Sequence, residues 1–267
     1  MRSHFLVGFC LAFVAACASL PAGHLVIVGG GGTPDNVMAR AIELAGGGSA
    51  RGLILPQASS RPEAGEESVA FWREKGLANV VSVDLADPAA ARAAIETADF
   101  IWFPGGDQSR LLQAVNDAGV GDAIRARYWA GAVVGGTSAG AAVMSPRMIV
   151  GGETADLTVV RGGSVEMVDG FGLLPETIVD QHFLVRRRFN RLLSAVVERP
   201  DLVGIGIDER TAIVVSFPSF EVMGEGGVLV LDARGTSAHG AEKGAPHACE
   251  GIRTSLLRAG MTFDLSR

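Results

Sequence analysis

Residues 132–144 have the sequence AVVGGTSAGAAVM, with Ser138 near the centre. The stretch predicts a buried strand, a tight turn with Ser138 at its tip, and a helix of small residues. Gly136 to Gly140 fits the pattern G-x-S-x-G, whose two glycines leave room for a strained turn. Such a turn presents the hydroxyl to a cleft above the start of the helix, where the amide of Ala139 can stabilise an oxyanion. The stretch therefore indicates a nucleophilic serine at the end of a strand.

The pattern gains its weight from this context, because glycine is abundant, at 36 of 267 residues. A near-copy at residues 235–239 (GTSAH) lacks the last glycine and follows a polar segment. We interpret this second copy, with Ser237 at its centre, as a loop. Ser138 is preferred because an apolar strand precedes it and helix-forming residues follow it.

Composition indicates a globular chain, with 48% hydrophobic and 19% charged residues. We expect one large domain over residues 24–267. The net charge of −6 argues against nucleic-acid binding as the main role. We expect no cofactor and no metal. The run Gly29 to Gly32 predicts a tight turn beside a cleft, because Pro34 stands where a dinucleotide-binding G-x-G-x-x-G needs its third glycine.

The N-terminus predicts an export signal over residues 1–17. Arg2 precedes an apolar run over residues 5–16 that is short for a bilayer span. Residues 14–17 (VAAC) are similar to a lipobox, which would make Cys17 a lipidated first residue; ordinary signal cleavage nearby and an uncleaved apolar N-terminus are the alternatives. We expect an exported protein, periplasmic, membrane-anchored by the lipid or secreted. Cys249 is the one cysteine outside this segment, so no disulfide within the mature chain is expected.

Strand and helix patterns alternate through the first half of the chain. Strands are expected at residues 24–28, 52–55, 80–85, 100–103 and in the stretch before Ser138, and helices at 35–44, 63–75, 88–97, 109–116 and 122–129. This alternation predicts a mostly parallel sheet flanked by helices, with functional groups at the carboxyl ends of its strands. The second half is richer in β-structure. Strands at 212–216, 221–223 and 228–231 are expected to form an antiparallel meander, and residues 236–251 a surface loop.

A nucleophilic serine needs a base and an orienting acid. Outside the signal segment the histidines are His24, His182, His239 and His247. His182 lies at a polar strand end, and the candidate acids Asp180, Asp208 and Glu209 also lie at strand ends. The chain order would then be Ser, His, acid. The alternative is an α/β-hydrolase, which follows the order Ser, acid, His and would use an acid such as Asp208 or Asp232 with His239 or His247.

Four arginines follow His182, at positions 186, 187, 188 and 191. Guanidinium groups hold carboxylates through two parallel hydrogen bonds, so this cluster suits a carboxylate-bearing substrate. A solvated basic helix face is the alternative interpretation.

Five pieces of the chain together resemble the cyanophycinase branch of the S51 serine peptidases, which are related to aspartyl dipeptidase. They run in family order over most of the chain: residues 103–108 (FPGGDQ), 136–141 (GTSAGA), 180–183 (DQHF), the arginines at 186, 188 and 191, and residues 204–209 (GIGIDE). The resemblance implies a fold like that of class I glutamine amidotransferases, with a β-rich C-terminal part.

The resemblance also implies roles for individual residues. Ser138 would be the nucleophile, His182 the base and Glu209 the acid. The amides of Ala139 and of Gly106 or Gly105 would form the oxyanion hole. The substrate-binding pattern of the family matches Gln108, Asp180, Gln181, Arg186, Arg188 and Arg191.

The implied function is hydrolysis of cyanophycin, a polyaspartate carrying arginine on its β-carboxyls, or of related aspartyl peptides, to β-Asp-Arg dipeptides. An aspartyl dipeptidase of the same family, an α/β-hydrolase-type esterase and a non-catalytic binding protein are the alternatives. The signal segment indicates that the protein acts outside the cytoplasm. The loop over residues 235–251 matches no motif of the family. A homodimer is a further expectation.

Overall fold

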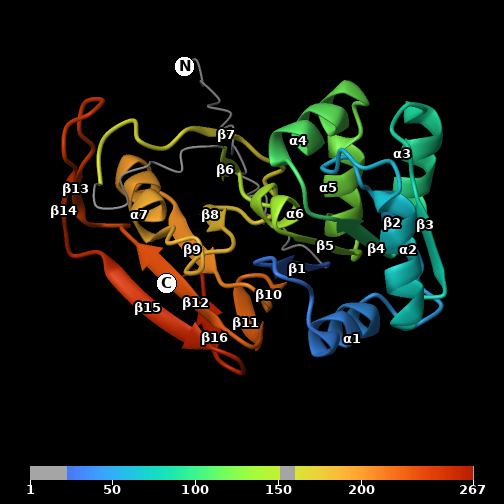
Figure 1. The fold of residues 1–267 in the computed structure, drawn as a ribbon. Helices are drawn as coiled ribbons and strands as arrows, with labels where there is room; N and C mark the ends of the chain where they lie inside the picture. Colours follow the sequence, from blue (N-terminus) through green and yellow to red (C-terminus); the bar gives the residue numbers. More distant parts are fainter. Residues whose placement is uncertain (1–22, 151–159, 267) are drawn as a thin grey trace, which may run out of the picture.

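The computed structural model describes residues 23–150 and 160–266 (Figure 1). The predicted signal segment and Cys17 lie outside the described residues, so export and lipidation stay predictions. Among the residues described, no helix combines the length and the apolar character needed to cross a bilayer.

Eight strands form the large sheet, in the order β16-β11-β10-β1-β5-β4-β2-β3. Their bounds are β1 (His24–Val28), β2 (Arg51–Ile54), β3 (Asn79–Ser82), β4 (Phe100–Phe103), β5 (Val133–Thr137), β10 (Thr211–Ser216), β11 (Ser219–Gly224) and β16 (Thr262–Asp264). Strands β1 to β5 pair in parallel, while β10, β11 and β16 extend the sheet in antiparallel fashion. The parallel half has the α/β arrangement that the alternating pattern predicts.

Helices cover both faces of this sheet (Figure 1). Their bounds are α1 (Asp35–Leu44), α2 (Ala64–Glu74), α3 (Pro88–Thr97), α4 (Gln108–Asp117), α5 (Gly121–Trp129) and α6 (Ala139–Ala142). Leu25 and Ile27 of β1 lie in the same buried cluster as residues of α3, α4 and α5, whereas Val26 and Val28 pack with residues of α1 and α2. Side chains alternate between the faces of a strand, so a strand covered on both sides reads as a continuous apolar run.

A second sheet carries the order β15-β12-β9-β8 and lies at the left of Figure 1. Its strands are β8 (Thr177–Asp180), β9 (Val203–Ile207), β12 (Gly227–Asp232) and β15 (Arg253–Arg258), and helix α7 (Phe189–Glu198) packs against it. Strands β8 and β9 are parallel neighbours, so their carboxyl ends lie side by side.

The prediction of a three-stranded C-terminal meander is wrong for its third strand. Strands β10 and β11 pair as predicted, but β12 leaves the large sheet and pairs with β9 and β15. The free edge of β11 is instead taken by β16. In the second sheet, Val228 and Val230 of β12 become fully buried, which favours this pairing.

The expected surface loop at residues 236–251 contains a short hairpin of β13 (Ser237–His239) and β14 (Ala248–Glu250). Its residues are mostly exposed, and Ser237 itself is exposed. Ser237 therefore does not lie on a strand-turn-helix unit.

A second short pair of strands, β6 (Arg147–Ile149) and β7 (Met167–Asp169), lies between α6 and β8 in the chain.

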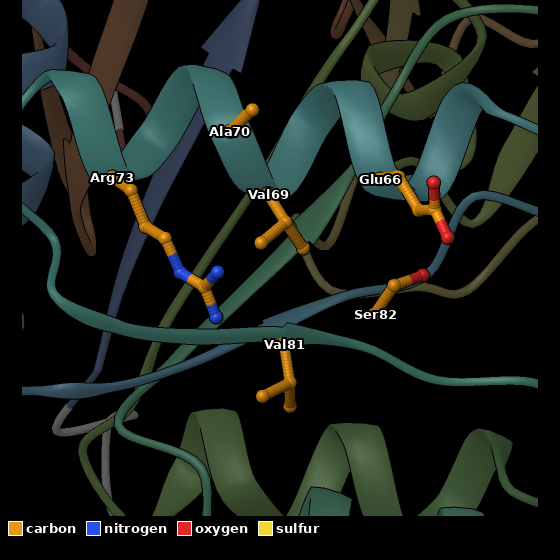
Figure 2. Close-up of a pocket in the computed structure, with 6 residues that line it drawn as sticks. All are labelled: Glu66, Val69, Ala70, Arg73, Val81 and Ser82. Atoms are coloured by element: carbon orange, nitrogen blue, oxygen red, sulfur yellow. The ribbon is translucent and has the colours of Figure 1, made fainter.

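The far edge of the large sheet is protected at β3. A hollow of about 510 Å³ lies between α2 and this strand and is lined by Glu66, Val69, Ala70, Arg73, Val81 and Ser82 (Figure 2). The guanidinium of Arg73 donates to the Val80 carbonyl at 2.9 Å. A charged side chain that occupies an edge carbonyl discourages pairing with another chain. No residue predicted for catalysis or substrate binding lines this hollow.

Candidate active site

Ser138 lies at the tip of the turn between β5 and α6, as the sequence predicts. Its backbone angles are φ 54° and ψ −110°, a strained conformation for a residue with a side chain. A Cβ on Gly136 would lie 2.5 Å from the Gly140 carbonyl oxygen, and a Cβ on Gly140 would lie 2.0 Å from that of Phe103. Only glycine fits these two positions, so the pattern around Ser138 has a steric origin.

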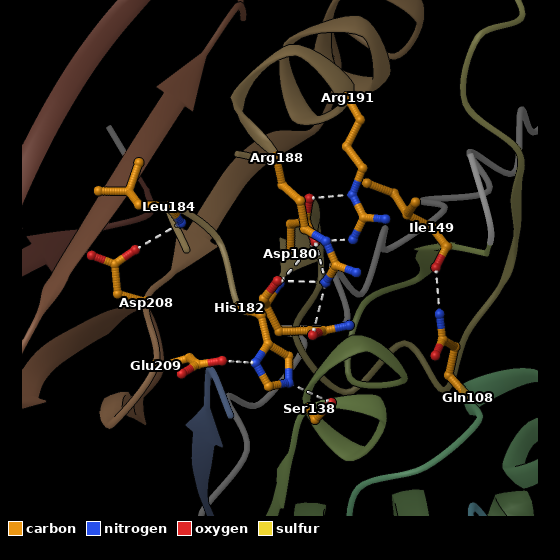
Figure 3. Close-up of polar contacts among 11 residues, drawn as sticks. Gln108, Ser138, Ile149, Asp180, His182, Leu184, Arg188, Arg191, Asp208 and Glu209 are labelled. Atoms are coloured by element: carbon orange, nitrogen blue, oxygen red, sulfur yellow. Dashed lines mark hydrogen bonds and ion pairs between the residues drawn. The ribbon is translucent and has the colours of Figure 1, made fainter. Parts of the chain in front are cut away.

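His182 follows β8 and approaches Ser138 from the second sheet. Its backbone is also left-handed, with φ 48°, and its amide donates to the Gly29 carbonyl at 2.6 Å. The imidazole Nε2 lies 3.0 Å from Ser138 Oγ (Figure 3). The nucleophile and its candidate base therefore come from different sheets, each at the carboxyl end of a strand.

Glu209 follows β9, the parallel neighbour of β8. Its Oε1 lies 2.5 Å from His182 Nδ1. Of the three candidate acids, Glu209 alone contacts the imidazole in the described structure; Asp208 instead accepts from the backbone amides of Leu184 and Gly227. Asp208 thereby ties the His182 loop to strand β12.

The three side chains form a continuous chain of hydrogen bonds from Ser138 to Glu209. A carboxylate at Nδ1 favours the imidazole tautomer that carries its proton there, which leaves Nε2 free to accept the serine proton. The arrangement is suited to nucleophilic catalysis by serine with histidine as general base.

The electrostatic surroundings favour the neutral form of this imidazole. Burial lowers the pKa of His182 below its ordinary value, the hydrogen bond that Glu209 accepts opposes that shift, and the positive charges of Arg186 and Arg188 lower the pKa further. A base must be unprotonated to act, so these surroundings extend its working range toward acidic pH.

Asp180 and Arg191 form a buried ion pair. Their side chains are 1% and 8% exposed. Arg191 Nε donates to Asp180 Oδ2 at 2.8 Å, and its Nη2 donates to Asp180 Oδ1. Two guanidinium nitrogens thus bind the carboxylate, and the pair connects the end of β8 to the first turn of α7.

Arg188 is engaged with the backbone and side chain of Gln181. Its Nη1 donates to the Gln181 carbonyl at 2.7 Å and to Gln181 Oε1 at 3.0 Å. Arg188 and Arg191 are therefore not the solvated basic face that one interpretation of the sequence favours. They bind the two residues directly before His182 and thereby stabilise the loop that carries it.

Arg186 and Gln108 are the substrate-binding candidates with more access to solvent. Arg186 is exposed on the His182 loop. Gln108, half-buried at the start of α4, donates from Nε2 to the Ile149 carbonyl at 3.0 Å (Figure 3). Their roles toward a substrate stay predictions.

The candidate oxyanion amides lie around the serine turn. Ala139 is the first residue of α6, directly after Ser138. A Cβ on Gly105 would lie 3.9 Å from Ser138 Oγ, so the loop after β4 runs beside the hydroxyl. Gly106 has φ 146°, and a Cβ there would lie 2.2 Å from the Ala58 carbonyl oxygen. The loop after β4 therefore runs beside Ser138 at Gly105, and the role of these amides toward an oxyanion stays a prediction.

The remaining histidines of the described chain make other contacts. His24 Nδ1 pairs with Ser216 Oγ at 2.8 Å. His247 accepts from the Ala241 amide and has Nε2 3.4 Å from Glu198, and His239 is exposed on β13. Asp232, the acid of the alternative order, is paired with Arg234 and Arg253. The geometry therefore selects His182, and it does not support the α/β-hydrolase arrangement.

The sequence alone does not reveal that the glycine run over residues 29–32 lies beside this site. Gly30 lies against the His182 ring and Gly31 against Glu209. Four glycines at a strand end were a usable signal, but their partners are about 150 to 180 positions away in the chain. Within residues 23–150 and 160–266, no group of three or more His, Cys, Asp or Glu side chains is arranged to hold a metal ion.

Comparisons with known proteins identify the family of the chain. The profile of peptidase family S51 matches residues 25–223. The chain is 36% identical to a cyanophycinase of Trichormus variabilis over 251 residues, 88% of this chain and 84% of that one. It is 37% identical to a cyanophycinase of Geminocystis herdmanii over 250 residues, 88% of this chain and 91% of that one.

Solved structures show the same fold. A peptidase from an acI-B1 actinobacterium superposes with a TM-score of 0.62 at 22% identity, covering 91% of this chain and 97% of that one. A putative peptidase E protein from Listeria monocytogenes superposes with a TM-score of 0.52 at 20% identity, covering 76% and 98%. Family profile and relatives together establish that this chain belongs to peptidase family S51 and is a serine-type peptidase.

Proposed function

We propose that this protein is a serine exopeptidase of cyanophycinase type. Its substrate would be cyanophycin or a related aspartyl peptide, and its products β-Asp-Arg dipeptides. The observation that carries the proposal is the hydrogen-bonded chain Ser138–His182–Glu209, set beside arginines in a chain that resembles cyanophycinases over 88% of its length.

In the proposed mechanism, Ser138 Oγ attacks the scissile carbonyl carbon while His182 Nε2 takes the hydroxyl proton. The resulting oxyanion is stabilised by the amides of Ala139 and of Gly105 or Gly106. His182 then gives the proton to the leaving amine, the C–N bond breaks, and an acyl-enzyme ester remains on Ser138. Water, deprotonated by His182, attacks the ester and releases the second product and the free serine.

Glu209 holds the imidazole in the tautomer that this sequence of steps needs, and it stabilises the imidazolium that forms. Because the Glu209 carboxylate already contacts Nδ1 at 2.5 Å, no rearrangement is required before attack.

Substrate recognition in this proposal falls to Arg186 rather than to the buried arginines. Arg191 is committed to Asp180 and Arg188 contacts Gln181, whereas Arg186 is exposed close enough to His182 for its charge to lower the pKa of the imidazole. An exposed guanidinium beside the base suits a free carboxylate of an aspartyl peptide. Asp180 and Gln181 then act by supporting this loop.

Replacing Arg186 with glutamine is expected to raise KM for a carboxylate-bearing peptide about ten-fold, because a charge-assisted hydrogen bond is lost. The pKa of His182 should also rise, since a nearby positive charge is removed. The acid limb of the kcat/KM profile would therefore move to higher pH. Steady-state kinetics between pH 4 and 9 check both effects.

The matched control is Arg187→Gln, at a neighbouring exposed arginine whose charge is not among the causes of the His182 shift. It should leave KM and the acid limb unchanged. Equal effects of the two substitutions would refute a specific role for Arg186.

The substrate is tested by incubating the purified chain with cyanophycin and, separately, with α-aspartyl dipeptides, and identifying the products by mass. Release of β-Asp-Arg from cyanophycin supports the proposal. Cleavage of the dipeptides alone would assign the chain to the aspartyl dipeptidase alternative. Cleavage of neither would refute both substrate assignments.

We also propose that the protein acts after export, guided by the signal-like segment and with Cys17 as a lipid attachment site. The mass of the mature chain purified from its host tests this. A lipid-modified N-terminal Cys17 supports anchoring, a shorter unmodified chain supports simple secretion, and an intact Met1 contradicts export.

A further inference from the structure

The carbonyls of Val28, Gly29 and Gly30 follow one another at the end of β1, and each accepts a different amide of the site. Val28 accepts from the Ser138 amide at 3.1 Å, and Gly29 accepts from the His182 amide at 2.6 Å. Gly30 accepts from the amide of Arg210, the residue after Glu209, at 2.8 Å. Three segments that are distant in the sequence are thus anchored to three consecutive residues of one strand end.

The glycines also contact the side chains directly. A Cβ on Gly30 would lie 2.3 Å from Cε1 and 2.4 Å from Nε2 of His182. A Cβ on Gly31 would lie 2.7 Å from the Cβ and 2.8 Å from Oε2 of Glu209. The imidazole and the carboxylate therefore rest on bare backbone, with no space for any side chain beneath them.

We propose that Gly30 and Gly31 are positioning residues, and that residues 28–31 form a backbone template that aligns Ser138, His182 and Glu209. The inference rests on the proposed catalytic roles of these three side chains. It assigns a purpose to the glycine run that the sequence alone identifies only as a tight turn.

The template matters because the serine and its base belong to different sheets. Ser138 extends from the large sheet, while His182 and Glu209 follow strands of the second sheet. Strand β1 belongs to the large sheet, and its end accepts the amide of His182, which follows β8 of the second sheet, so the end of β1 lies where the two sheets meet. Anchoring all three segments there fixes the distance of 3.0 Å between Nε2 and Oγ against relative movement of the sheets.

Gly30→Ala tests the proposal, with Gly32→Ala as the matched control. Both positions have positive φ, 102° at Gly30 and 96° at Gly32, so both variants carry backbone strain. A Cβ on Gly32 would meet its nearest neighbour, Arg210 Nη1, at 3.6 Å, which is ordinary contact. The two variants therefore differ in the overlap with His182.

The readouts are the rate at which a serine-directed phosphonate labels Ser138, kcat and KM on the substrate that the wild type cleaves, and the thermal midpoint. In Gly30→Ala we expect labelling and kcat to fall about 100-fold relative to Gly32→Ala, with KM little changed, because the imidazole is displaced from the serine. The thermal midpoints of the two variants should be similar.

A proton NMR spectrum supplies a readout that needs no activity. The strongly deshielded proton between His182 and Glu209 should be present in wild type and Gly32→Ala, and lost or shifted in Gly30→Ala. Equal labelling rates and unchanged spectra in both variants would overturn the template. If instead the wild type cleaves no aspartyl peptide but these differences persist, the proposed substrate fails and the template stands.

Discussion

Replacing Ser138 or His182 with alanine is expected to lower kcat/KM by about 10⁴-fold or more, the largest effect of any substitution discussed for this protein. Ser138→Ala removes the atom proposed to form the acyl-enzyme, and His182→Ala removes the group 3.0 Å away that is proposed to accept its proton. When two residues act together in catalysis, removing either one abolishes most of their joint contribution. The kcat/KM of the double variant should therefore be little lower than that of each single variant. Initial rates of product release, measured by mass spectrometry, check this.

Two controls make the loss specific. Ser237→Ala changes the serine of the near-copy pattern, which is exposed on β13. His247→Ala changes one of the two histidines of the alternative arrangement, and this histidine lies beside Glu198. Both should retain the wild-type rate. Loss of activity in His247→Ala with retention in His182→Ala would restore the α/β-hydrolase alternative.

The second large effect concerns stability. Arg191→Met should lower the free energy of unfolding by about 3–5 kcal/mol, because it leaves the buried Asp180 carboxylate without its hydrogen-bonded ion partner and with Arg188 3.9 Å away as its remaining cation. Adding Asp180→Leu to this variant should recover part of the loss, since the buried carboxylate is then removed while Arg188 keeps its hydrogen bonds to Gln181. Urea denaturation of the two variants and the wild type checks both statements.

The pair Arg199–Asp201 supplies the matched control. It has the same two-nitrogen geometry, with contacts of 2.9 and 2.7 Å, but its side chains are 37% and 59% exposed. Arg199→Met should therefore cost no more than about 1 kcal/mol. A small effect of Arg191→Met, equal to that of Arg199→Met, would show that Arg191 is not committed to Asp180 and would return it to the substrate-binding candidates.

Local signals allowed much of the parallel half of the fold to be predicted. Helix α3 has Asp87 as its N-cap, accepting from the Ala90 amide, and Pro88 at its first position, so its start is marked in the sequence. Strand β4 is a continuous apolar run, and its observed bounds match the predicted strand at residues 100–103. The turn at Ser138 was predictable because Gly136 is required within the turn itself, where a Cβ would meet the Gly140 carbonyl.

Features that depend on contacts between distant segments could not be predicted from the sequence. The departure of β12 into a second sheet follows from the pairing of β11 with β16, whose residues come about 40 positions later. The arginines after His182 were expected to face the substrate, yet Arg191 is held by Asp180, a carboxylate eleven positions earlier. The choice of Glu209 over Asp208 as the partner of His182 came from the resemblance, because both residues end the same strand.

The central claim is that Ser138 is activated for attack by His182. The most direct test is to treat the purified protein with a serine-directed phosphonate and to locate the adduct by peptide mass mapping. We expect one phosphonate per chain, on Ser138, with labelling abolished in His182→Ala. An unlabelled Ser138, or an adduct on another serine such as Ser237, would contradict it.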